Sequence, residues 1–353
     1  MRTLLVATLM LTLVPSCKKD KGAKKKPADP DKTAEVKKKE PPPEPAKPEV
    51  VKLDGFQVPE SILYDQANDV YLVSNINGEP GKKDDNGVIM RVSPPPDAKI
   101  VEAKFIDGAA EKTTLNAPKG MAIWSGTLYV ADIDTVRMFD PNTGAPKGEI
   151  KLPGATFAND VTAHDGTVYV SDSGFDKNFK PGKGQAIWAI KDGKAKKLAS
   201  GLELGGPNGL LAKGDDLWVV TASGEIYKLT KDGKRDAVEK MAAGSLDGII
   251  ADKDGTLHVS SWDGKTIYTG APGSWTKNGE LTSPADIGYD PKRGLTLVPI
   301  FLENRIEIHP TAKAGEGEPA AATPPEGDAK PAEGGDAKPV EEKKPAEEKP
   351  ATP

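Results

Sequence analysis

Cysteine and histidine are scarce in this sequence, which has one cysteine and three histidines among 353 residues. A single cysteine cannot form an internal disulfide, so the fold must depend on an apolar core. The apolar run at residues 4–14 is too short to cross a membrane, because a spanning helix needs about 20 residues. No Gly-x-x-x-x-Gly-Lys-Ser/Thr run and no basic face with interleaved aromatics occurs, and the formal net charge is −5. We therefore expect no P-loop and no nucleic-acid partner.

The N-terminal segment is organised like a secretory signal, with a short charged start, the apolar run and small residues before Cys17. Val14-Pro15-Ser16-Cys17 resembles the lipobox of bacterial lipoproteins. The resemblance implies that residues 1–17 are a lipoprotein signal, that Cys17 is acylated, and that the exported protein is lipid-anchored in the cell envelope. Lys18 after the cysteine favours the outer membrane over the inner one. An ordinary signal peptide with a chance cysteine remains the alternative.

Two segments consist almost wholly of Lys, Glu, Asp, Pro, Ala and Gly, namely 18–49 and 311–353. Neither has an apolar periodicity, so we expect both to be disordered and solvated. All the apolar periodicity lies between them. The sequence therefore predicts one globular domain over residues 50–310.

Short apolar strands separated by Asp-Gly turns fill this domain. Thr127–Ala131 and Thr167–Ser171 alternate apolar and polar residues, and pairs such as Asp165-Gly166 are typical of tight hairpins. One local pattern also occurs six times: a short polar or proline-containing turn, a β-branched or apolar pair, a glycine turn and then a strand. Successive copies lie 59, 40, 49, 39 and 38 residues apart. The copies begin at Pro59, Pro118, Ala158, Pro207, Leu246 and Pro284. Six repeats of about 40 residues predict an all-β, six-bladed β-propeller.

Two details of the propeller follow from the same repeat. The long intervals contain Gly/Lys/Asp-rich insertions at 79–86 and 175–184, which we expect to be loops. The segments 49–53 and 305–309 are placed to pair within one blade, which would close the ring and remove its exposed edges.

Equivalent positions of a propeller lie at equivalent radii, so the second residues of the repeats should converge on the central channel. These residues are Glu60, Lys119, Asn159, Asn208, Asp247 and the Ala285-Asp286 pair. Carboxylate and amide oxygens suit a hard cation such as Ca²⁺. The alternative interpretation is that Asn-Gly and Asp-Gly pairs only form turns.

The same motifs resemble those of the senescence marker protein/gluconolactonase/regucalcin family and, more distantly, the paraoxonases. Pro59-Glu60-Ser61, Asn159-Asp160, Pro207-Asn208-Gly209-Leu210 and Leu246-Asp247-Gly248 occur in that family's order. The resemblance implies a divalent cation held by Glu60, Asn208 and Asp247, with Asp247 also the general base. It implies that Asn159 touches the substrate or the metal. Lys119 would contact substrate or be a partly solvated side chain at the channel mouth.

Two departures from the family pattern bear on the substrate. Phe157 stands where the family has an arginine for a sugar-acid substrate, which argues against such a substrate here. His164, His258 and His309 lie away from the repeated motif, so a histidine-based site of the paraoxonase kind is not expected.

Two functions remain open from the sequence. The first is a Ca²⁺-dependent lactonase or esterase acting on a small, less polar molecule. The second is a non-catalytic binding or scaffold propeller of the cell envelope, with a structural metal or none. In both cases we expect a monomer that contacts the membrane only through its lipid.

The lipobox resemblance predicts that Cys17→Ser abolishes fatty-acid attachment, because the thiol is the acylated group. Metabolic labelling with a radioactive fatty acid, followed by membrane fractionation, measures this directly. Wild type should carry label and sediment with membranes, whereas the variant should carry none. Equal labelling of the two proteins would show that Cys17 is not the attachment site.

Overall fold

The computed structural model describes residues 49–176 and 180–320, and the regular secondary structure of this part of the chain consists almost entirely of strands. Two short 3-10 turns, Leu202–Leu204 and Phe301–Glu303, interrupt them. No helix in the described residues has the length and apolar character needed to cross a membrane. Residues 1–17, and with them Cys17, lie outside the described part, as do most of the two charged segments.

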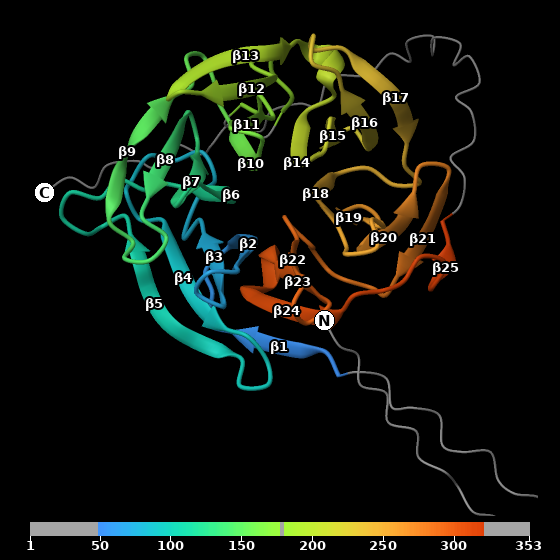
Figure 1. Ribbon diagram of the computed structural model, residues 1–353, viewed down its shortest axis with the longest axis horizontal. Coiled ribbons are helices and arrows are strands. Elements are labelled where there is room, and N and C mark those ends of the chain that lie inside the picture. The colour runs from blue at the N-terminus through green and yellow to red at the C-terminus, as the bar shows by residue number, and fades with distance from the viewer. Residues whose placement is uncertain (1–48, 177–179, 321–353) are drawn as a thin grey trace, which may run out of the picture. The chain divides into compact units, whose positions relative to one another are not determined.

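Six antiparallel sheets surround a central channel, one after another along the chain (Figure 1). Blades 1 to 3 are β2 (Pro59–Asp65), β3 (Val70–Asn75), β4 (Val88–Ser93), β5 (Lys99–Asp107); β6 (Pro118–Trp124), β7 (Thr127–Asp132), β8 (Thr135–Phe139), β9 (Pro146–Lys151); and β10 (Ala158–His164), β11 (Thr167–Asp172), β12 (Ala186–Lys191), β13 (Lys194–Ser200). Blades 4 to 6 are β14 (Pro207–Lys213), β15 (Asp216–Thr221), β16 (Glu225–Leu229), β17 (Arg235–Lys240); β18 (Leu246–Ala251), β19 (Leu257–Ser261), β20 (Thr266–Ala271), β21 (Ser274–Asn278), β25 (Glu318–Pro319); and β22 (Gly288–Asp290), β23 (Leu295–Ile300), β24 (Arg305–Pro310), β1 (Val51–Asp54). The six-bladed propeller predicted from the repeat is confirmed.

The ring closes in blade 6, where the first strand of the domain pairs with the last. β1 runs antiparallel to β24, with Val51 opposite Ile308 and Leu53 opposite Ile306. The predicted closure is therefore confirmed. The chain continues past the predicted domain end at 310, because β25 pairs with β21 and Ala320 packs against the core between blades 4 and 5.

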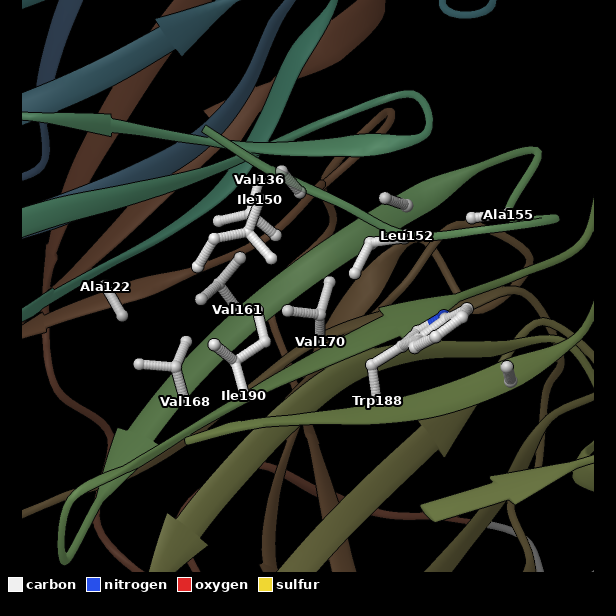
Figure 2. Packing of buried hydrophobic residues seen from close by; sticks show 13 residues of the cluster. Ala122, Val136, Ile150, Leu152, Ala155, Val161, Val168, Val170, Trp188 and Ile190 are labelled. Atoms are coloured by element: carbon white, nitrogen blue, oxygen red, sulfur yellow. The ribbon is translucent and has the colours of Figure 1, made fainter. Parts of the chain in front are cut away.

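Apolar side chains fill the spaces between neighbouring blades. Between blades 2 and 3, Val136 and Ile150 pack towards Val168, Val170 and Trp188 (Figure 2). Successive residues of a strand point to opposite faces. Tyr169, between the two valines, accordingly packs on the other side, against blade 4. Both faces of β11, the second strand of blade 3, thus pack against neighbouring blades, which explains why such strands are rich in Val, Leu and Tyr.

A buried carboxylate joins the two strands of the closure. Glu307 on β24 is 3% exposed, and its Oε1 lies 3.0 Å from Lys52 Nζ on β1. Arg305 donates to the same oxygen and His309 Nε2 lies 3.0 Å from Oε2. Hydrogen bonding with His309, together with Lys52 and Arg305, lowers the pKa of Glu307 from 4.5 to about 2, against the effect of burial. The ionised form of Glu307 therefore stabilises the closed ring.

Glu307→Gln should lower the free energy of unfolding at pH 7 by about 1–3 kcal/mol, because the folded state holds the Glu307 carboxylate more strongly than the unfolded state does. A depressed folded pKa contributes stability that is present above pH 4.5 and lost as the pH falls towards 2. Urea unfolding of wild type and variant across this range measures both effects.

Asp216→Asn is the matched control, since Asp216 pairs with Lys228 at 2.8 Å and both side chains are partly exposed to solvent. Its loss should change stability by less than about 1 kcal/mol. If Glu307→Gln behaved like Asp216→Asn and kept the wild-type acid sensitivity, the ion cluster would not stabilise the closure.

Candidate functional site

The repeated motif opens the innermost strand of the blades. Five innermost strands begin at the first residue of a copy, namely β2, β6, β10, β14 and β18. In each of them the register with the next strand shifts within the motif, as at a β-bulge. Such a bulge bends the strand and re-aims its side chains. Two consecutive motif residues can therefore face the channel instead of alternating across the sheet.

A cavity of about 360 Å³ lies at this end of the channel. Its lining includes the residues that the sequence placed at the channel in five of the six repeats: Glu60, Lys119, Asn159, Asn208 and Asp247. Asp286, from the sixth copy, lines a second cavity of about 250 Å³ along the inner strands. Residues spread over 188 positions of the sequence (247 minus 60, plus one) are thus brought to one place by the ring.

Glu60 and Asp247 are the two buried carboxylates of the first cavity, whose lining also includes the exposed Asp263. They are 6% and 7% exposed, and one oxygen of each, Glu60 Oε2 and Asp247 Oδ1, is buried without a hydrogen-bond partner. Burial and the charge of Asp247 raise the pKa of Glu60 well above its usual range. Burial and the charge of Asp286 raise the pKa of Asp247 to about 8. Two such oxygens need a proton or a cation to compensate for their lost hydration.

Two further carboxylates, Asp160 and Asp286, occupy the third position of their repeats. Asp160 Oδ2 accepts a hydrogen bond from the Leu210 backbone amide of blade 4 at 2.6 Å. Asp286 Oδ2 accepts one from Ser61 Oγ of blade 1 at 2.5 Å. Burial raises the pKa of both, that of Asp286 to about 7. Asp160 was not among the site residues predicted from the sequence, although its position in the repeat is the same as that of Asp286.

Glycine at the third position of other copies makes room for these neighbours. A Cβ on Gly120 would collide with Asp160, and one on Gly248 would collide with Asp286 and the Ile287 amide. Gly209 lies against the Asp247 carbonyl oxygen in the same way. The inner strands therefore approach one another closely because three copies of the motif have glycine at the third position, where the next blade arrives.

The remaining predicted residues are held by hydrogen bonds to the protein. Lys119 is 1% exposed, so the alternative of a partly solvated lysine is wrong. Its Nζ donates to the Pro80 and Ala117 carbonyls at 3.0 and 3.1 Å. Burial lowers its pKa, while the charge of Glu60 opposes that effect.

The two asparagines use their amide NH₂ groups on the protein. Asn159 donates to Ser173 Oγ at 3.0 Å, and Asn208 donates to the Leu246 carbonyl at 3.3 Å. This arrangement leaves the amide carbonyl oxygens as the groups that a ligand can use. Within residues 49–176 and 180–320, no cluster of three or more His, Cys, Asp or Glu has metal-binding geometry, so any cation here would depend on two carboxylates and an amide.

Aromatic residues complete the lining of the cavity, and Phe157 is the only one of them singled out from the sequence. Trp262 Nε1 donates to Asp247 Oδ2 at 2.6 Å and so fixes that carboxylate. Phe175 and Phe301 also line the cavity. These residues follow the second strands of their blades rather than opening the first, so the repeated motif gave no signal for them. None of the three histidines lines this cavity, as expected from the sequence.

Comparison with known proteins found no matching family model and no matching curated protein. Solved structures do match. A gluconolactonase from Xanthomonas campestris has a TM-score of 0.53 at 15% identity, covering 73% of this chain and 88% of that one. This similarity shows that the two proteins share a fold. Virginiamycin B lyase from Staphylococcus aureus has a TM-score of 0.52 at 15% identity, covering 74% and 98%. A luciferin-regenerating enzyme has 0.53 at 12%, covering 76% and 100%.

Gly209→Ala should lower the free energy of unfolding by about 1–3 kcal/mol, because the added methyl collides with the Asp247 backbone in a fully packed ring. Gly81→Ala is the control, since nothing lies within 4 Å of its added Cβ. That change should stay within about 0.5 kcal/mol. Equal stability of the two variants in denaturant unfolding would show that the inner strands can separate without loss.

Proposed function

We propose that this protein is a divalent-cation-dependent hydrolase of lactones or esters, with Ca²⁺ as the preferred cation. The observation that carries the proposal is the pair of buried, unpartnered carboxylate oxygens on Glu60 and Asp247 in one cavity. The fold shared with a gluconolactonase supports it at low sequence identity.

The charge of the channel favours a cation. Four buried carboxylates, Glu60, Asp160, Asp247 and Asp286, face one buried ammonium, Lys119, which sums to −3 if all are ionised (four negative, one positive). Burying unbalanced charge costs several kcal/mol per ion. Glu60, Asp247 and the Asn208 carbonyl oxygen would hold the cation, since all three are the hard oxygen ligands that Ca²⁺ requires.

Such a cation, when bound, would polarise a substrate carbonyl. Asp247 would take the proton of the attacking water as the general base. The Trp262 indole would hold this carboxylate in one orientation. Asn159 and Lys119 would position the substrate from the opposite blades.

We also place the enzyme in the cell envelope, anchored through Cys17 and tethered by residues 18–49. The support for this part is the sequence alone, namely the lipobox-like Val14–Cys17 and the charged, proline-rich segment after it. A long solvated tether would hold the catalytic domain away from the membrane surface.

Removing the cation should destabilise the wild-type domain and leave a carboxylate variant almost unaffected. Bound ligand stabilises by about 2.7 kcal/mol when present at 100 times its dissociation constant. Chelator should therefore lower the wild-type Tm by several degrees and shift Glu60→Ala much less, as measured by thermal unfolding, with calcium titration calorimetry as the direct readout.

Asp247→Asn separates binding from catalysis, because it keeps an oxygen ligand and removes the base. The proposal expects this variant to retain measurable calcium binding and to lose lactone and aryl-ester hydrolysis. Hydrolysis by Asp247→Asn at the wild-type rate would exclude Asp247 as the base. If wild type shows neither calcium heat nor a chelator effect, the cation proposal is wrong.

A further inference from the structure

Two aromatic pairs stand on different sides of the channel cavity. Phe157 and Phe175, which flank blade 3's inner strands, meet edge to face with ring centroids 5.4 Å apart. Trp262 of blade 5 and Phe301 of blade 6 meet with centroids 5.1 Å apart. Blades 3 and 6 lie across the ring from each other (Figure 1). The cavity thus has aromatic walls above a polar floor.

The floor and the walls of the cavity differ in the chemical character of their side chains. All the charged and amide groups of the predicted site belong to the motif at the start of the inner strands. The walls are mainly aromatic and apolar. Phe175, Trp262 and Phe301 follow the second strands of their blades, and Phe157 directly precedes β10. Ile76, Ala222 and Leu246 add to the apolar surface, while Ser245 and Asp263 are polar residues of the same lining. A ligand that fits both surfaces has a polar head on the floor and an apolar body between the walls.

A third cavity, of about 430 Å³, shares part of its lining with the first. Both are lined by Pro80, Phe157 and Phe175, so the phenylalanine pair lies at their junction. The rest of the third cavity's lining comes from Glu79, Gly81 and Lys82 on one insertion and from Thr156 and Asp176. The ligand space therefore extends from the channel axis past the phenylalanine pair to the first insertion.

The position of Phe157 disfavours a polyhydroxylated ligand. Its ring lies 4.5 Å from Lys119 Nζ, beside the polar floor, and offers no hydrogen-bonding group to the hydroxyls of a sugar acid. Hydroxyl groups placed against aromatic rings would lose their hydration without gaining partners. An alkyl or aryl group in the same place would bury apolar surface instead.

We propose that the substrates are elongated lactones or esters with an alkyl or aryl substituent, seated with the carbonyl on the floor and the substituent along the Phe157–Phe175 pair. This inference rests on the proposed hydrolase function and adds the substrate class. Such a molecule uses both cavities, whereas a compact sugar lactone uses only the floor.

A series of δ-lactones tests the class in the wild-type protein. The value of kcat/KM should rise with each added side-chain methylene from δ-valerolactone to δ-dodecalactone, by up to about fourfold per methylene. Glucono-δ-lactone should be the poorest substrate. A flat series, or a preference for glucono-δ-lactone, would overturn the substrate class while leaving the hydrolase function intact.

Binding measured without turnover separates the two proposals. Calorimetric titration with 4-phenylbutyrate should give at least tenfold tighter binding than titration with gluconate. Phe157→Ala and Phe175→Ala should remove that difference, and Phe157→Leu should keep part of it. Phe105→Ala, which removes a ring packed on Arg91 away from the cavity, should keep all of it.

The outcomes are distinct. Phenylbutyrate binding that depends on Phe157, with no hydrolysis of any lactone, would support the apolar ligand site and refute the hydrolase. Equal binding of phenylbutyrate and gluconate would refute the ligand class whatever the hydrolysis assay shows. Tm values close to wild type for Phe157→Leu and Phe105→Ala keep the comparison free of unfolding.

Discussion

Burial of four carboxylates around one lysine is the constraint on which this channel depends. Glu60, Asp160, Asp247 and Asp286 each lose most of their hydration, and the charges of the three aspartates add to the effect of burial in raising the pKa of Glu60. Asp160 and Asp286 recover hydrogen bonds from neighbouring blades. Glu60 and Asp247 keep a buried oxygen without one. A protein tolerates such a charge only when the surrounding structure fixes it and a counter-charge is available, which is why the cation is central to the proposed chemistry.

The ring supplies the fixed surroundings. Inner strands approach closely because Gly120, Gly209 and Gly248 have no side chain where the next blade arrives. Apolar clusters between blades hold the sheets in register, and the β1–β24 pairing with Glu307 closes the circle. The geometry of the site is therefore a property of the whole domain, since every blade contributes a carboxylate, Lys119 or Asn208 to the channel.

The repeat was enough to predict the propeller, its closure and the five cavity residues, because equal phase in the sequence means equal radius in the ring. Trp262 and Phe301 could not be predicted, since they reach the cavity from loops of variable length that share no motif. The pairing of β25 was also missed, because Glu318–Pro319 has the composition of the charged tail and forms only two residue pairs with β21. The roles of Glu60, Asn208 and Asp247 as ligands remain a prediction that their burial and proximity support.

Sensitised terbium luminescence tests the cation site most directly, because Tb³⁺ replaces Ca²⁺ in oxygen sites and emits when a nearby tryptophan is excited. Trp262 donates a hydrogen bond to Asp247, so it would lie beside a cation bound there. The account predicts saturable emission from wild type that Ca²⁺ displaces, strong loss of terbium affinity in Glu60→Gln, and weaker emission from bound terbium in Trp262→Phe. Absence of emission, or emission equal in all three proteins, would contradict a cation held by Glu60 and Asp247.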